Sequence, residues 1–155
     1  MSDYRIRPAT LDDLDALVHH RLAMFTEMGT TFDAPAIGRM FRDWLLKMMP
    51  AHEYRAWLCE TDAREVVAGA GITLIPWPPG PRAIRSDRIA FVYNVYTEPA
   101  HRKRALARRL METIHLWCAD NGVGAVSLNA AAAAEHLYAS QGYQPAPRPM
   151  MWKIV

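Results

Sequence analysis

The sequence is short of cysteine and of net charge. Its two cysteines, Cys59 and Cys118, are far apart and fit neither a disulfide framework nor a C-x-x-C metal pair. The 18 basic and 16 acidic side chains leave a formal charge of +2, which is too small to indicate a general nucleic-acid or membrane partner. Any basic character that matters must therefore be local.

Long apolar runs are also missing. No segment reaches the roughly 18–20 apolar residues that a membrane span requires. The start of the chain lacks the apolar stretch of a signal peptide and instead contains the acids Asp3, Asp12, Asp13 and Asp15. Together with the few cysteines, these absences predict a protein of the reducing cytoplasm.

What is present is typical of one globular domain. A length of 155 residues is that of an ordinary domain, and a hydrophobic content of 51% provides enough apolar side chains for a core. We therefore expect a single domain over residues 1–155.

Apolar periodicity and turn residues predict the order of the elements. Strands are expected over residues 4–7, 55–60, 66–75, 89–97 and 123–129, with a strand-like region from 143 to 155. Helices are expected from the capping box of Thr10 and Asp13 to Gly29, and over 36–49, 102–121 and 131–141. The proline-rich stretch 76–81 cannot be regular, and Gly142 is expected to be a left-handed C-cap. This order predicts an α/β domain.

A basic turn joins the strand at 89–97 to the helix expected at 102–121. Arg102, Lys103 and Arg104 open that helix, whose first backbone N–H groups have no partner within the helix and carry partial positive charge. A phosphate or pyrophosphate could be held there. The Walker P-loop and the Rossmann glycine motif are absent, and a helix that opens with three basic residues is more often a solvated face.

Two motifs give residues 92–143 a resemblance to the GNAT superfamily, the GCN5-related N-acetyltransferases. The segment 95–99 followed by Arg102-x-x-Ala105-x-Ala107 resembles that family's strand end and its R-x-x-G-x-G/A turn. The segment 137–143, Leu-Tyr-Ala-Ser-Gln-Gly-Tyr, resembles its L-Y-x-x-x-G-F motif. Residues 6–13 look like the family's opening strand and first helix, so the resemblance spans nearly the whole chain.

The chain departs from the family pattern at the turn glycines and at one asparagine. Both glycines are alanines, Ala105 and Ala107; within a helical first turn we expect neither to need a positive φ. The asparagine that often begins the last long helix is replaced, and Asn129 just upstream is a candidate substitute.

The resemblance implies a GNAT-like mixed, mostly antiparallel sheet flanked by helices, with acetyl-CoA as acyl donor and no metal. The pantetheine arm would pair with the strand backbone, and N–H groups of the turn would hold the pyrophosphate. The implied cofactor-binding residues are Val95, Tyr96, Thr97, Arg102, Lys103, Arg104, Ala105, Leu106, Ala107 and Asn129.

Acetyl transfer requires a neutral amine, a stabilised oxyanion and a proton for the departing thiolate. Tyr138 matches the family's usual proton donor, although it could also be a core aromatic. Asn94, on the strand where some members carry a carboxylate, could orient a water molecule. Glu27 could approach the substrate as a base, or be an exposed helix residue.

The implied function is acetyl-CoA-dependent N-acetylation of a primary amine on a small molecule or peptide. The alternative is a non-catalytic GNAT-fold module that binds acyl-CoA as a sensor or interaction domain. No nucleic-acid or membrane partner is expected. A homodimer stays open, because Trp77 could be a lid, a dimer contact or a loop stiffener.

Overall fold

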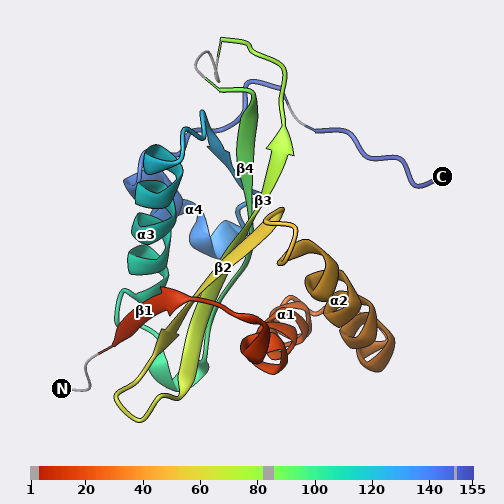
Figure 1. Cartoon of the computed structure of the whole chain (residues 1–155), viewed down its shortest axis with the longest axis vertical. Helices are drawn as coiled ribbons and strands as arrows, with labels where there is room; N and C mark the ends of the chain where they lie inside the picture. The colour runs from red at the N-terminus through yellow and green to blue at the C-terminus, as the bar shows by residue number, and fades with distance from the viewer. Residues whose placement is uncertain (1–3, 82–85, 149) are drawn as a thin grey trace.

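The fold is one five-stranded sheet with helices on both faces (Figure 1). The computed structural model describes residues 4–81, 86–148 and 150–155. The strands lie in sequence order: β1 (Arg5–Pro8), β2 (Tyr54–Glu60), β3 (Val66–Pro76), β4 (Arg88–Thr97) and β5 (Val126–Ser127). The first four are antiparallel to their neighbours, and β5 is parallel to β4. The predicted mixed, mostly antiparallel sheet is therefore confirmed.

Helices cover the two faces in pairs. On one side lie α1 (Leu14–Glu27) and α2 (Ala34–Met48), and on the other α3 (Leu106–Asp120) and α4 (Glu135–Ser140) (Figure 1). Short 3₁₀ turns precede three of the helices: η1 (Leu11–Asp13), η2 (Pro99–His101) and η3 (Ala132–Ala134). The capping box of Thr10 and Asp13 is confirmed, and it caps η1, which leads into α1.

Each face of the sheet has its own hydrophobic core. Leu110 and Ile114 of α3 belong to one core, and Leu17, Phe41 and Leu45 of α1 and α2 to the other. Because both faces are covered, consecutive residues of β2 and β3 are buried, whereas a half-exposed strand buries alternate ones.

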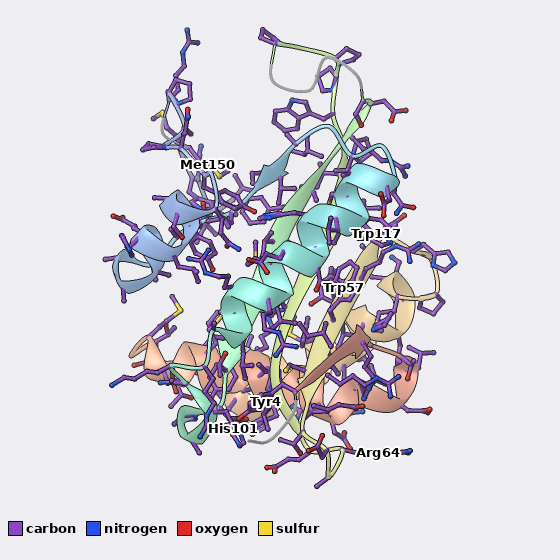
Figure 2. All side chains as sticks on the ribbon, turned by 90° about the vertical axis from the view of Figure 1, so that its left-hand side faces the viewer. Tyr4, Trp57, Arg64, His101, Trp117 and Met150 are labelled. Carbon is purple, nitrogen blue, oxygen red and sulfur yellow. The ribbon has the colours of Figure 1, made fainter. Side chains whose placement is uncertain are left out.

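Two aromatic contacts join segments that are far apart in the sequence (Figure 2). The rings of Trp117 on α3 and Trp57 on β2 lie 5.8 Å apart. At the start of the chain, the Tyr4 hydroxyl lies 2.9 Å from Nδ1 of His101 in η2. The second contact holds η2, which leads from β4 into α3, against the start of the chain.

The observed boundaries differ from the predicted ones in the C-terminal half. The helix expected from residue 102 begins at Leu106, because Lys103 and Ala105 have φ of +62° and +58°, which a helix cannot contain. The strand expected over 123–129 is the two-residue β5. Within the expected last strand, residues 143–148 and 150–155 form none, and the Trp152 side chain is exposed.

Two further expectations concern turn residues. Residues 77–81 form neither helix nor strand, as predicted, but Pro76 is the last residue of β3. Gly142 has a φ of +90°, which confirms its left-handed conformation. Within the described residues, no helix is both long and apolar enough to cross a membrane.

Replacing Gly71 and Gly38 by alanine should have opposite effects on the free energy of unfolding, because the added methyl group meets different surroundings. A Cβ on Gly71 would overlap the Tyr54 hydroxyl, whereas one on Gly38 in α2 would meet Leu22 Cδ1 at 3.4 Å, an ordinary contact. We expect Gly71→Ala to lower the free energy of unfolding by about 1–3 kcal/mol. Gly38→Ala should raise it by about 0.5–1 kcal/mol, because alanine favours the helix. Urea denaturation of the two variants measures both; a neutral Gly71→Ala would contradict the predicted overlap.

Candidate functional site

A β-bulge in β4 shapes the centre of the site. Gly69 pairs with Tyr96 and Gly71 with Tyr93, so Ala70 of β3 faces both Asn94 and Val95. Asn94 is the additional residue of the bulge and has a φ of +57°, a left-handed conformation that asparagine tolerates better than most residues. Such a bulge bends its strand and re-aims the side chain that it carries.

Beyond its first residues, β4 separates from β5. The two strands pair only at Ala90 with Val126 and Phe91 with Ser127. In the part of the chain that the structure describes, the β5-facing edge of β4 then has no partner strand over residues 92–97. Amide groups along such an edge can pair with an extended ligand.

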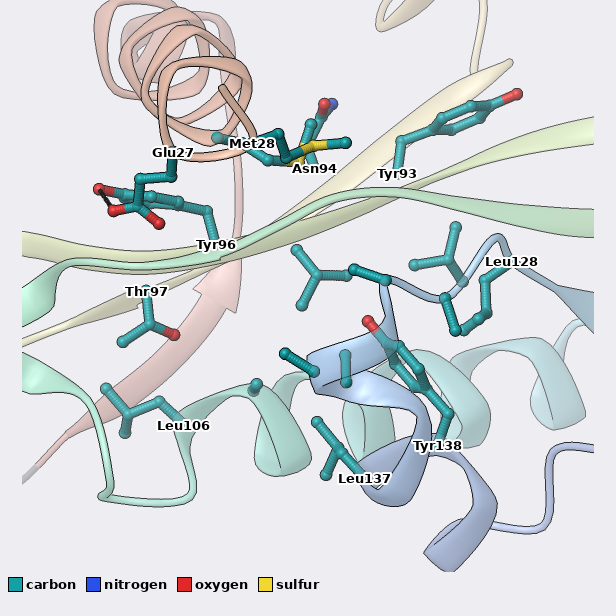
Figure 3. Close-up of a pocket in the computed structure, with 18 of the residues that line it drawn as sticks. Glu27, Met28, Tyr93, Asn94, Tyr96, Thr97, Leu106, Leu128, Leu137 and Tyr138 are labelled. Carbon is teal, nitrogen blue, oxygen red and sulfur yellow. Dashed lines mark hydrogen bonds between the residues drawn. The ribbon is translucent and has the colours of Figure 1, made fainter. Parts of the chain in front are cut away.

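A cavity of about 940 Å³ opens at this separation. Residues of α1 line it on one face of the sheet, and the start of α3, the β5–α4 connection and α4 line it on the other. Figure 3 shows Glu27, Met28 and Asn94 on one side of β4, with Leu106 and Tyr138 on the opposite side. The cavity thus connects the two faces.

The loop before α3 presents free backbone donors. The first helical hydrogen bond runs from the N–H of Arg109 to the carbonyl of Ala105 at 3.0 Å. Among the described residues, the N–H groups from Lys103 to Arg108 have no acceptor. These groups and the helix dipole suit an anion. The expectation that Ala105 needs no positive φ is wrong, because it is the left-handed N-cap of α3.

The basic side chains of the loop have different surroundings. Arg102 donates to the Thr97 carbonyl at 2.9 Å and to Glu27 Oε1 at 2.5 Å, so it ties the loop to the end of α1. Lys103 lines the cavity. Arg104 is not among the lining residues, and its guanidinium carbon lies 6.0 Å from the Tyr4 ring centre.

Tyr138 belongs to both the core and the cavity. Its side chain is 7% exposed and packs in the core beneath α3, yet its hydroxyl points from α4 toward β4 (Figure 3). That hydroxyl makes no hydrogen bond to the described residues. Burial raises the pKa of the phenol, so it stays protonated at neutral pH. A protonated donor is therefore available inside the cavity.

Asn94 is held on both sides of its amide. Arg21 Nη1 donates to its Oδ1 at 2.7 Å, and its Nδ2 donates to the Tyr54 hydroxyl at 3.0 Å. Burial raises the pKa of Tyr54 to about 12. Gly71 is needed here, because any side chain at that position would displace the Tyr54 hydroxyl. The orientation of Asn94 is thus fixed by α1 and β2.

Glu27 is partly exposed and ion-paired with Arg102. The Tyr96 hydroxyl is 3.5 Å from Glu27 Oε1 and 3.4 Å from Glu98 Oε2. The Glu27 carboxylate, a candidate base, therefore already has the Arg102 guanidinium and the Tyr96 phenol beside it.

The structure brings all but one of the expected site residues together. The cavity is lined by Glu27, Asn94, Val95, Tyr96, Thr97, Arg102, Lys103, Ala105, Leu106, Ala107, Asn129 and Tyr138, with Arg104 outside. Sequence reasoning missed Arg21. Its signal was its place four residues from both Leu17 and Phe25, on the apolar stripe of α1. Among the described residues, no group of three or more His, Cys, Asp or Glu side chains could hold a metal ion.

Comparison with known proteins relates the whole domain to acetyltransferases. The sequence matches the acetyltransferase (GNAT) family over residues 14–143. A GCN5-related N-acetyltransferase from Ralstonia eutropha is 33% identical, with a TM-score of 0.86 and 99% of each chain covered. No curated protein matches the sequence.

More distant structures share the fold. A predicted acetyltransferase from Clostridium acetobutylicum, solved with acetyl-CoA, is 19% identical with a TM-score of 0.83, over 97% of this chain and 96% of that one. An aminoglycoside N-acetyltransferase in complex with CoA is 13% identical with a TM-score of 0.77, over 99% of this chain and 96% of that one.

Replacing Ala105 and Ala107 by glycine should have opposite effects on the free energy of unfolding, because only Ala105 is left-handed. A left-handed conformation costs an L-residue about 1–2 kcal/mol, so we expect Ala105→Gly to raise the free energy of unfolding by about 0.5–1 kcal/mol after the entropy cost of glycine. Ala107 lies inside α3, and Ala107→Gly should lower it by a similar amount. Chemical denaturation of the two variants measures the difference; destabilisation by both would contradict the left-handed conformation of Ala105.

His20 predicts a loss of stability in mild acid. It is 2% exposed, and burial lowers its pKa from 6.5 to about 4. Because the pKa of His20 in the folded protein lies below that in the unfolded chain, protonation favours the unfolded chain. The contribution of neutral His20 to the free energy of unfolding is therefore complete above pH 6.5 and is lost as the pH falls toward 4. The expected loss between pH 7 and pH 5 is roughly 2 kcal/mol.

Urea denaturation across this range, with His20→Gln alongside, measures that loss. Burial also lowers the pKa of His115, which acts in the same sense, so the contribution of His20 is the difference between the two proteins. Equal pH dependence in both would show that His20 does not titrate in this way.

Proposed function

Since the chain belongs to the acetyltransferase (GNAT) family, we propose that it is an N-acetyltransferase that uses acetyl-CoA to acetylate a primary amine of a small molecule or peptide. The observation that carries the proposal is the cavity that passes between β4 and β5. It joins an anion-binding loop on one face of the sheet to a separate compartment under α1, which suits two substrates that meet at β4.

The donor would occupy the face of α3 and α4. Free N–H groups from Lys103 to Arg108 suit the pyrophosphate, and the open edge of β4 suits the amides of the pantetheine arm. Val95, Tyr96, Thr97 and Asn129 line this path. Arg102 would act as a positioning residue, because its side chain is already bound to Thr97 and Glu27.

Tyr138 would serve as hydrogen-bond donor to the leaving sulfur. A phenol with a pKa of about 10 is uphill of a thiol of about 8.5 by roughly 2 kcal/mol. Burial raises the pKa of Tyr138 further, which makes complete proton transfer harder. A charge-assisted hydrogen bond to the developing thiolate therefore describes its contribution better.

The amine must lose its proton before it attacks. An alkylamine with a pKa near 10.4 is neutral about once in a thousand molecules at pH 7.4. The ion pair with Arg102 favours a positioning role for Glu27 over that of a base, and Asn94 would help to align the acceptor.

A cytoplasmic location is also part of the proposal, supported by the free, buried thiols of Cys59 and Cys118.

The test joins donor binding to turnover. Acetyl-CoA should raise the melting temperature of the protein, and free CoA should be released when amines are added. We expect Tyr138→Phe to lower kcat about 100-fold, as for the loss of one preorganised hydrogen-bond donor to a developing charge, with acetyl-CoA affinity unchanged. The release of free CoA, followed with a thiol reagent, measures kcat, and titration calorimetry measures the affinity for acetyl-CoA.

Tyr143→Phe is the matched control. Tyr143 packs edge-on against Tyr138 and meets His115 at 2.8 Å, but it does not line the cavity. Its loss should leave kcat unchanged. Unchanged turnover in Tyr138→Phe would reduce that residue to a core aromatic, and acetyl-CoA binding without transfer to any amine would favour a non-catalytic acyl-CoA-binding module.

A further inference from the structure

Arg21 is a cation without an anion. It projects from α1 into the cavity, where its guanidinium carbon lies 4.8 Å from the ring centres of both Phe25 and Phe41. Its hydrogen bond goes to the neutral amide of Asn94. Within the described part of the chain, no carboxylate forms an ion pair with it. Burial lowers its pKa, yet an arginine remains charged at neutral pH.

Arg7 and Arg102 have acidic partners, whereas Arg108, on the α3 side of the cavity, donates to the Ser140 hydroxyl. Arg7 binds Asp13 and Glu60, and Arg102 binds Glu27. A partly buried guanidinium is normally paired in this way, because desolvation of an unpaired charge is unfavourable. Arg21 thus differs from Arg7 and Arg102 in having a neutral amide, and no carboxylate, as its hydrogen-bond partner.

The half of the cavity under α1 is where this charge acts. Besides Arg21, its lining includes Met24, Phe25, Met28 and Tyr93, which bring mainly apolar surface. The acidic side chain of Glu27 at this end is compensated by Arg102. The compartment left for the acceptor therefore carries one uncompensated positive charge in apolar surroundings.

The guanidinium is also held in a fixed orientation. Two aromatic rings confine it, and one nitrogen is engaged by Asn94, while a guanidinium has five N–H donors in all. The remaining donors form the fork that matches a carboxylate. Little conformational freedom would be lost when an anion binds.

We propose that Arg21 binds a carboxylate of the acceptor, so that the substrates are amines that also carry a carboxylate. This inference rests on the proposed acetyl transfer and specifies its substrate class. A free amino acid and the C-terminus of a peptide present the same chemistry, and the experiment distinguishes them.

The test compares amines that differ only in this charge. The panel contains ω-amino acids of increasing length and short peptides with free ends, each paired with its carboxamide. We expect wild-type kcat/KM to favour the carboxylate in at least one pair by about tenfold or more, as for a lost charge-assisted hydrogen bond. The better class, amino acid or peptide, identifies the source of the carboxylate.

Variants assign the preference to Arg21. Arg21→Gln also loses the bond to Asn94, which affects both substrates of a pair, so we expect it to raise KM for the carboxylate about tenfold more than KM for the carboxamide. Arg21→Lys should keep part of the preference. Arg42→Gln is the control, because Arg42 pairs with Asp15 and does not line the cavity. An equal rise of melting temperature with acetyl-CoA in wild type and Arg21→Gln shows that the donor site is intact.

The outcomes separate the inference from the proposed function. Equal kcat/KM within every pair, a preference that persists in Arg21→Gln, or transfer only to amines that lack a carboxylate overturns the role of Arg21 and leaves acetyl transfer standing. Acetyl-CoA binding with no turnover of any carboxylate-bearing amine also overturns it. Absence of acetyl-CoA binding to the wild type rejects the proposed function itself.

Discussion

The separation of β4 from β5 is the constraint on which the site depends. β4 pairs with β3 along most of its length but with β5 only at Ala90 and Phe91. The extra residue at the bulge changes the course of β4 just beyond these pairs. If the two strands paired further, the cavity between them would close and the edge proposed to bind the donor would be occupied.

The bulge itself depends on side chains from other elements. Asn94 keeps its left-handed conformation while Arg21 and Tyr54 hold its amide, and Tyr54 fits only because Gly71 has no side chain. Residues of α1, β2 and β3 therefore act together on one position of β4. Under the proposed function, Arg21 would link acceptor binding to the residue that shapes the gap.

The regular elements, the capping box and the left-handed Gly142 could be predicted from the sequence, whereas the bulge and the left-handed Ala105 could not. The strands and helices follow from periodicity, which is local. The bulge depends on the register with β3, which no local pattern of β4 shows. The left-handed conformation of Ala105 cannot be predicted either, because the apolar stripe that begins at Leu106 predicts a helix whatever the conformation of the residue before it. The end of the chain has a strand-like pattern, but residues 150–155 have no neighbouring strand in the described structure.

The left-handed Ala105 shows how the loop keeps an unfavourable backbone conformation without glycine. Its surroundings must offset about 1–2 kcal/mol. On one side Arg102 is bound to the Thr97 carbonyl and to Glu27, and on the other Leu106 is buried in the core. With both flanking residues fixed, the N–H groups between them are already ordered. Under the proposed function, a pyrophosphate that binds there would not have to order the loop, which would favour affinity and compensate for the missing glycines.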